Sequence, residues 1–126
     1  MRSGRVRRLI SSGSPWESTF GYSRGVITGD TMFVSATAGD GEDVYAQTRD
    51  ALATIEKVLT ENGFRMGDVV QSRLAVADFD HWQDAARAHG EVYSEIRPAF
   101  ALVHVLPFVD EAILVEVEAV AVRAGA

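Results

Sequence analysis

The stretch that decides the fold runs from Ile113 to Val122 and reads ILVEVEAVAV. Side chains alternate between the two faces of a strand, so one face consists of apolar residues only, namely Ile113, Val115, Val117, Ala119 and Ala121. The opposite face carries Leu114, Glu116, Glu118, Val120 and Val122. Because apolar residues occur on both faces, we expect the first face to be core and the second to be covered, either by the chain itself or by another subunit. With both predicted helices on one side of the sheet, a subunit contact is the favoured cover.

The two carboxylates on this second face are candidate catalytic groups. Glu116 and Glu118 lie about 7 Å apart by the geometry of a strand. A carboxyl group removed from water has a raised pKa and can act as a general acid or base. The alternative is that both glutamates are solvated, or paired with arginines, on an open sheet face, because buried charges are rare.

The rest of the chain predicts a mixture of strands and helices. Apolar residues recur every three or four positions in residues 44–62 and 80–97, which predicts two helices. Alternation and β-branched residues predict strands at 5–10, 22–27, 31–37, 69–77 and 100–106. Gly29 and Asp30 suit a two-residue hairpin turn. The order predicts an α+β fold in which a mixed β-sheet carries two helices packed on one face.

The composition bounds the class of protein. The chain has 126 residues and a formal net charge of −6, and it contains no cysteine. The length fits a single domain over residues 1–126. An acidic chain is a poor fit to nucleic acid, because binding phosphates needs clustered Lys and Arg. No apolar run is long enough to span a membrane and no secretory signal pattern follows the basic start, so we expect a cytoplasmic location.

The three histidines do not form a convincing ligand set. His81 and His89 lie on the second predicted helix, and His104 shares a strand face with Phe100 and Leu102. A lone histidine on an apolar face is more often a hydrogen-bonded core or interface residue than a catalyst. We therefore expect no metal, and the absence of glycine-rich phosphate or dinucleotide motifs gives no sign of a cofactor.

Several short motifs follow one another in a characteristic order. They are Gly21-Tyr22-Ser23-Arg24-Gly25-Val26, Phe33-Val34-Ser35, Gln47-Thr48-Arg49-Asp50-Ala51-Leu52, Gly63, Asp68-Val69-Val70, Asp78, Arg97-Pro98-Ala99 and Val115-Glu116-Val117-Glu118-Ala119. No single motif is specific, but the ordered set is. From about Tyr22 to the C-terminus, the chain resembles the Rid family (YjgF/YER057c/UK114).

The resemblance implies a compact domain similar to one class of chorismate mutase, assembled as a homotrimer with ligand clefts between neighbouring subunits. Members of the best-studied branch hydrolyse enamine and imine intermediates, such as 2-aminoacrylate, to 2-keto acids and ammonia without a cofactor. A tyrosine, a serine and a glutamate line the cleft of that branch, and they match Tyr22, Ser35 and Glu116. The resemblance thus implies that Glu116 positions or activates water, while Tyr22 and Ser35 supply hydrogen bonds.

One position departs from the family pattern. The deaminating branch has an arginine for the substrate carboxylate directly after the Pro-Ala pair, where this chain has Phe100. Because phenylalanine cannot make that charge-assisted contact, the chain resembles a branch that lacks the deaminase arginine. We expect Phe100, with Ala101 and Leu102, to line a cleft for a more apolar or aromatic ligand. Arg87 is a candidate for restoring the cation from another wall, and the alternative is a surface ion pair with Glu91.

Two functions stay open at this point. The first is hydrolysis or deamination of an imine or enamine, or a related hydrolysis or tautomerisation of a small organic metabolite. The second is a non-catalytic module that binds a small molecule or docks a partner, which the missing arginine favours. The sequence does not name the substrate.

Overall fold

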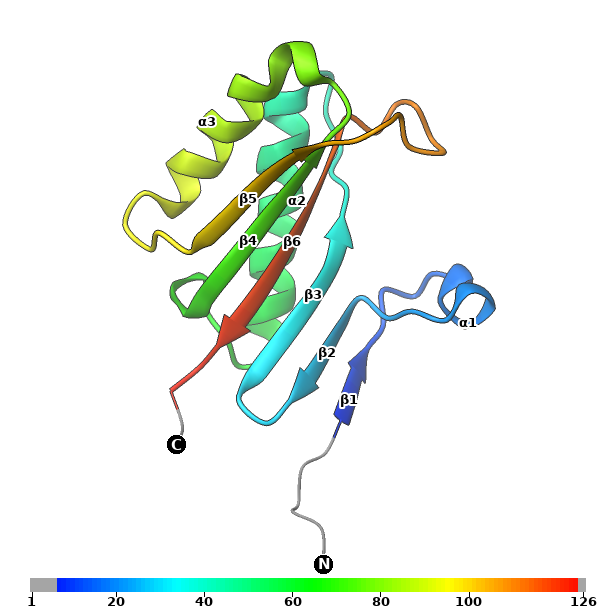
Figure 1. Ribbon diagram of the computed structural model, residues 1–126. Coiled ribbons are helices and arrows are strands. Elements are labelled where there is room, and N and C mark those ends of the chain that lie inside the picture. Colours follow the sequence, from blue (N-terminus) through cyan, green and yellow to red (C-terminus); the bar gives the residue numbers. More distant parts are fainter. Residues whose placement is uncertain (1–6, 125–126) are drawn as a thin grey trace, which may run out of the picture.

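The computed structural model describes residues 7–124, which form a six-stranded sheet and its helices (Figure 1). The elements in chain order are β1 (Arg7–Ile10), α1 (Trp16–Phe20), β2 (Gly25–Thr28), β3 (Thr31–Thr37), α2 (Val44–Glu61), the 3-10 helix η1 (Met66–Asp68), β4 (Val69–Val76), the 3-10 helix η2 (Phe79–His81), α3 (Trp82–Tyr93), β5 (Ala99–His104) and β6 (Val115–Val122). The strands are ordered β1-β2-β3-β6-β4-β5. The α+β fold with a mixed sheet, predicted from the sequence, is confirmed.

The last strand of the chain lies inside the sheet. β6 pairs antiparallel with β3 along one edge and with β4 along the other. Its buried residues are Val115, Val117, Ala119 and Ala121, and the residues between them are half-buried or exposed. This is the alternation that the sequence predicts, and it holds because both backbone edges of β6 are hydrogen-bonded while only one face meets the core.

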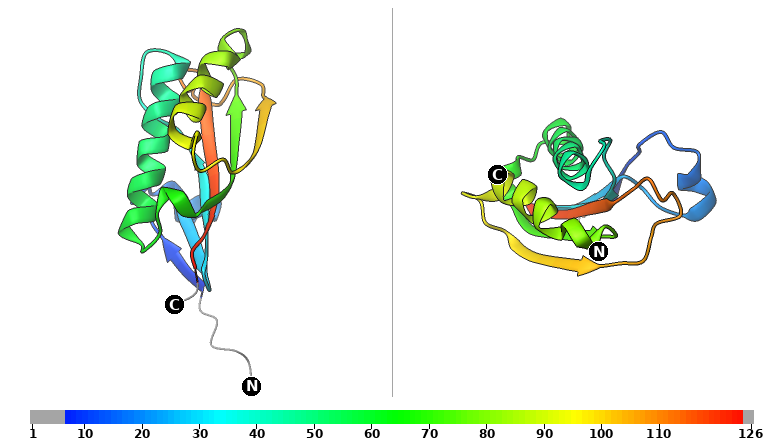
Figure 2. Two further views of the ribbon diagram at one scale, coloured as in Figure 1. Left: turned by 90° about the vertical axis from the view of Figure 1, so that its left-hand side faces the viewer. Right: turned by 90° about the horizontal axis from the view of Figure 1, so that it is seen from above.

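Helices α2 and α3 lie side by side on one face of the sheet, and the opposite face carries neither of them (Figure 2). The buried stripe of α2 includes Leu52, Ile55 and Leu59, which belong to the same core cluster as the buried residues of β6. A parallel pair of strands needs a crossover connection, and α3 supplies it between β4 and β5. The prediction of two helices on one face is therefore confirmed.

Two local signals fix where elements begin and turn. The side chain of Asp43 accepts a hydrogen bond from the backbone N–H of Ala46 at 2.8 Å, which caps the start of α2. Gly29 adopts a φ of 58° in the hairpin between β2 and β3, a conformation that glycine adopts at little cost. The two-residue turn predicted at Gly29 and Asp30 is confirmed by the pairing on either side of it.

Several elements differ from the sequence-based expectation. The strands predicted at 22–27, 100–106 and 113–122 are shorter in the structure, as β2, β5 and β6, and the helices differ as well. The sequence does not predict α1, because no residue of this five-residue helix is buried and it therefore has no apolar stripe. The second helix is shorter than residues 80–97, because residues 79–81 form η2 and α3 ends at Tyr93. Arg97 then takes a φ of 55°, outside the helical region. Residues 5 and 6 of the first predicted strand lie outside the described residues.

His89 lies buried between α3 and the sheet. Its Nε2 atom is 2.9 Å from Oγ of Ser72, and its ring lies 4.6 Å from the ring of Tyr93 and 4.3 Å from that of Phe100. Burial lowers the pKa of His89 to about 4, because the charged imidazolium is poorly solvated there. His89 is thus a core histidine that is neutral in the folded protein at neutral pH.

We expect the stability of the fold to depend on pH through His89. The neutral ring stabilises the folded state fully above the ordinary pKa of about 6.5, and this contribution is lost as the pH falls toward the folded pKa of about 4. The loss attributable to this group is at most about 3 kcal/mol. Urea unfolding between pH 7 and pH 4 checks it, and His89→Gln should give a flatter pH profile than the wild-type protein.

His81 provides the matched control, because it is exposed and its pKa is raised by a hydrogen bond to Asp78. His81→Gln should leave the steep fall below pH 6.5 in place. A His89→Gln profile as steep as that of the wild-type protein would show that His89 does not carry the effect.

Candidate functional site

Glu116 is half-buried on the face of the sheet that α2 and α3 leave uncovered. It lies opposite Ala75 of β4, and Glu118 lies on the same face one alternation further along β6. Burial raises the pKa of the Glu116 carboxyl above its ordinary value, and the nearby charge of Glu118 adds to the rise. A carboxyl group in this condition can exchange a proton near neutral pH more readily than a solvated one.

Ser35 lies on β3, the strand next to β6. Its backbone N–H donates to the carbonyl of Arg24 at 3.0 Å, and its Oγ donates to the carbonyl of Ser23 at 2.6 Å. The pairing of β3 with β6 shifts register between Val34 and Thr37, so Ser35 sits at a bulge that disrupts the regular ladder. The serine is held by the backbone of the segment that leads into β2.

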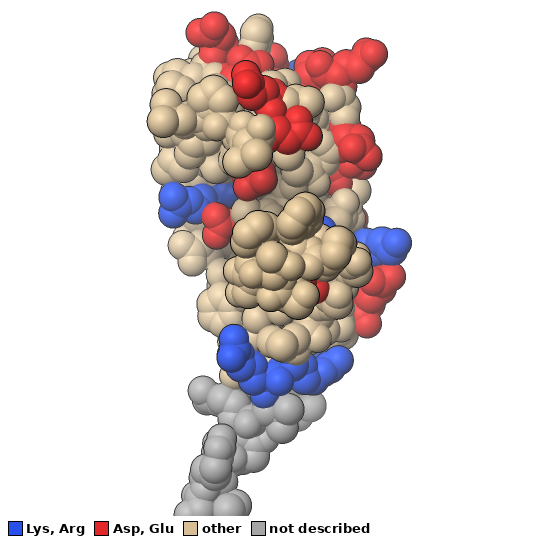
Figure 3. All heavy atoms as spheres, turned by 90° about the vertical axis from the view of Figure 1, so that its right-hand side faces the viewer, with Lys and Arg blue, Asp and Glu red and all other residues tan. Residues whose placement is uncertain are grey.

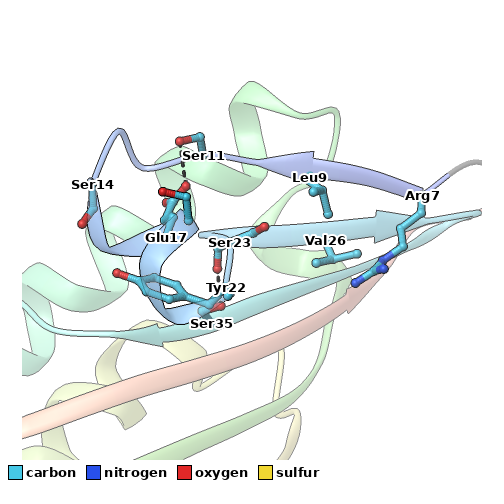
Figure 4. A pocket seen from close by; sticks show the side chains of 11 residues that line it. Arg7, Leu9, Ser11, Ser14, Glu17, Tyr22, Ser23, Val26 and Ser35 are labelled. Carbon is cyan, nitrogen blue, oxygen red and sulfur yellow. Dashed lines mark hydrogen bonds between the residues drawn. The ribbon is translucent and has the colours of Figure 1, made fainter.

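Tyr22 and Ser35 line one hollow of about 740 Å³ on the same face of the sheet (Figure 4). Its walls come from β1, α1, the segment before β2, and β3, and the lining residues are Arg7, Leu9, Ser11, Ser14, Glu17, Ser18, Gly21, Tyr22, Ser23, Val26 and Ser35. Six of these eleven residues carry a hydroxyl group. Two of the three matched cleft residues thus share a hollow, while Glu116 is not part of its wall.

The sequence does not predict that the serine-rich segment before α1, together with α1 itself, forms one wall of the hollow. Glu17 accepts hydrogen bonds from Ser11 Oγ at 2.8 Å, from the backbone N–H of Ser12 at 2.7 Å and from Ser12 Oγ at 2.5 Å. These bonds lower the pKa of Glu17, with the side-chain bond from Ser12 contributing most. The available signal was three hydroxyl residues shortly before a glutamate, a pattern that by itself predicts only a loop.

Phe100 and Glu116 lie on opposite faces of the sheet within one chain. Phe100 pairs with the buried Ser72 in the parallel β4–β5 ladder, and its ring lies 4.3 Å from that of His89 on the helix side. Leu102 shares this face and packs on the core, whereas Ala101 lies on the face of Glu116. A single chain therefore does not bring Phe100 to the hollow lined by Tyr22.

Arg87 lies on the outer surface of α3. Its guanidinium nitrogens lie 3.4 Å from a carboxylate oxygen of Asp84 and 3.4 Å from one of Glu91. Its Cζ atom lies over the ring of Tyr45, 4.1 Å from the ring centroid. The surface ion pair with Glu91, one of the two alternatives drawn from the sequence, is present. Within one chain this pairing engages Arg87 away from both Glu116 and the hollow.

Residues 7–124 contain neither a cluster of metal ligands nor a membrane-spanning helix. No group of three or more histidine, aspartate or glutamate side chains is arranged there to hold a metal ion. No helix of this part of the chain is both long enough and apolar enough to cross a membrane.

Comparison with known proteins decides the family. The family model described as endoribonuclease L-PSP matches residues 14–123. The chain belongs to this family. A crystal structure of Rv2704 from Mycobacterium tuberculosis, described as a member of the YjgF/YER057c/UK114 family, superposes with a TM-score of 0.88 at 41% identity, covering 94% of this chain and 100% of that one. The family drawn from the sequence motifs is confirmed.

Curated relatives of this endoribonuclease L-PSP family member range from uncharacterised to enzymatic. An uncharacterised protein of Streptomyces coelicolor is 37% identical, with 98% of this chain and 96% of the relative covered. A 2-iminobutanoate/2-iminopropanoate deaminase of Salmonella typhimurium is 27% identical, with 81% of this chain and 87% of the relative covered. The resemblance to this deaminase is thus more distant than the resemblance to the uncharacterised protein.

We expect Glu116 to titrate above the ordinary pKa of a glutamate, and Glu118→Gln to bring that pKa down, because the substitution removes the neighbouring negative charge. Carboxyl-carbon NMR over a pH titration measures both. Glu111→Gln, in the loop before β6, is the matched control and should leave the midpoint of Glu116 in place. A midpoint at or below the ordinary value would contradict the account of a sheltered carboxyl.

Proposed function

We propose that the chain, as one domain over residues 1–126, acts on a small organic metabolite by adding water to a C=N bond, or by a related hydrolysis or tautomerisation. The distant relative named as a 2-iminobutanoate/2-iminopropanoate deaminase supports this reaction class. The observation that carries the proposal is the sheltered Glu116 on the same sheet face as the hollow of Tyr22 and Ser35. The cytoplasmic location stays a prediction.

The residues divide the chemistry as follows. Glu116 accepts a proton from water while the water oxygen forms a bond to the imine carbon, and the nitrogen gains a proton. The hydroxyl group of the adduct then gives up its proton, which Glu116 passes to the nitrogen as the C–N bond breaks, releasing ammonia and leaving a carbonyl compound. Ser35 and Tyr22 hold the substrate by hydrogen bonds, and no step needs a cofactor or a redox partner.

The proposed assembly is a homotrimer whose clefts join residues of two subunits. β5 is an edge strand, and Phe100 on it is 46% exposed. The uncovered sheet face also carries Phe33, which is 49% exposed. An edge strand and an apolar patch of this kind favour contact with a neighbouring copy, which would place Phe100, Ala101 and Leu102 of one subunit beside Glu116 of the next.

Phe100 sets the expected ligand apart from 2-aminoacrylate. We propose that the chain belongs to a branch without the deaminase arginine, because phenylalanine offers a stacking face but no charge-assisted bond to a carboxylate. Arg87 belongs to the site only if the assembled cleft draws it away from its ion pairs with Asp84 and Glu91.

A second candidate function is binding of a metabolite without turnover. The observation that favours it is the engagement of Phe100 with His89, which puts an apolar ring where the deaminating branch has its cation. Ligand stabilisation in a thermal-shift screen, with no product formed, would support it. Tight, salt-dependent association with RNA would instead overturn the expectation, drawn from the net charge of −6, that nucleic acid is not a partner.

We expect Glu116→Gln to lower kcat/KM for a responsive imine by at least about 100-fold, since a general acid–base group contributes on that scale. The assay follows release of ammonia from imines generated in situ from a panel of aliphatic and aromatic amino acids. Glu111→Gln, in the loop before β6, is the matched control and should retain most of the activity. Turnover that is unchanged in Glu116→Gln would remove the proposed role of this carboxyl group.

A further inference from the structure

The hollow of Tyr22 and Ser35 has a cation at one end. Arg7 lies opposite Thr28 and Leu9 lies opposite Val26 in the β1–β2 ladder, so these side chains share the uncovered face. Figure 4 shows the guanidinium of Arg7 directed back along the strand toward Val26. Among residues 7–124, Arg7 is the one cationic residue that lines the hollow, and it makes no ion pair with any other of these residues.

The other end of the hollow is anionic and rich in hydroxyls. The carboxylate of Glu17 lies there beside Tyr22 and Ser35, and its hydrogen bonds from Ser11 and Ser12 keep it ionised. Figure 3 shows the same polarity on a larger scale, with basic side chains gathered at the end where the described part of β1 begins and acidic ones at the opposite end. The hollow is therefore electrically polar along its length.

An apolar floor separates the two ends. Leu9 and Val26 lie between Arg7 and the hydroxyl groups. The backbone N–H of Ser35 donates to the carbonyl of Arg24, and Arg7 lies opposite Thr28. Arg24 and Thr28 are four residues apart, so the two ends of the hollow are about 13 Å apart along this segment. The side chain of Arg7, which points back over this floor, shortens the span that a ligand must bridge.

We propose that the hollow binds an extended organic acid whose carboxylate and protonated nitrogen stand at opposite ends of an apolar chain. Arg7 holds the carboxylate, Leu9 and Val26 contact the chain, and Glu17 faces the nitrogen beside the hydroxyls of Tyr22 and Ser35. The inference deepens the proposed function, since it shares Tyr22 and Ser35 with it and names the class of substrate. Arg7 would also supply a positive charge for the substrate carboxylate, which Phe100 cannot supply.

The distance between Arg7 and Glu17 favours extended molecules over those whose two charges are adjacent. In an α-amino acid or a 2-imino acid, the nitrogen and the carboxylate are attached to neighbouring carbon atoms. Such a molecule can reach Arg7 or Glu17 but cannot reach both, and its second charge would be left over the apolar floor. The short molecules therefore make only one of the two charge-assisted contacts and should bind more weakly than the extended ones.

Calorimetric titration with ε-aminocaproate tests the proposal. Norleucine is its isomer with adjacent charges, and it should bind at least about tenfold more weakly, the value of one charge-assisted hydrogen bond. Arg7→Gln should weaken ε-aminocaproate by a similar factor, and Arg7→Lys should recover part of the loss. Arg8→Gln is the matched control, because Arg8 pairs with the buried Ile27 and lies on the other face of β1.

The outcomes separate this inference from the proposed reaction. Equal affinity for the two isomers, no binding of ε-aminocaproate, or wild-type affinity in Arg7→Gln would each overturn it, even if imines are turned over. Arg7-dependent binding of ε-aminocaproate without any imine turnover would leave the inference standing and count against the proposed reaction alone. Circular dichroism of each variant confirms that the fold is kept.

Discussion

The fold depends on one constraint, which is the position of β6 between β3 and β4 with only one face in the core. Both backbone edges of the strand are hydrogen-bonded, so its register is set on two sides. A slip by one residue would turn Glu116 and Glu118 into the core and Val115 and Val117 out of it, at a cost that a small domain cannot sustain. The packing that stabilises the fold is therefore also what holds Glu116 on the uncovered face.

The uncovered face carries Glu116 and, apart from it, a hollow lined by other candidate site residues. The bulge in β3 and the turn before β2 place Ser35 and Tyr22 in a hollow, and the segment around α1 adds Glu17 to its wall. The helix face, by contrast, holds a neutral His89 under Phe100. Within the endoribonuclease L-PSP family, this chain thus combines a half-buried glutamate of raised pKa with an edge strand that presents an apolar ring.

The sequence predicts most of the fold because its elements are coded locally. The alternation in β6, the apolar stripe of α2 and the turn at Gly29 each follow from a few neighbouring residues. The site is harder to predict from the sequence, because it depends on side-chain contacts that no periodic pattern marks. The placement of Phe100 against His89 follows from the β4–β5 register, and the bonds from Ser11 and Ser12 to Glu17 follow from a fold of the chain that no periodic pattern marks.

We propose that further copies of the chain cover the sheet face that α2 and α3 leave open, and that together they complete the clefts. Sedimentation equilibrium at micromolar concentration, combined with hydrogen exchange at the backbone amides of the edge strand β5, tests this most directly. We expect a mass three times that of the single chain and slow exchange along β5. A monomer of uniform mass whose β5 amides exchange freely would contradict it.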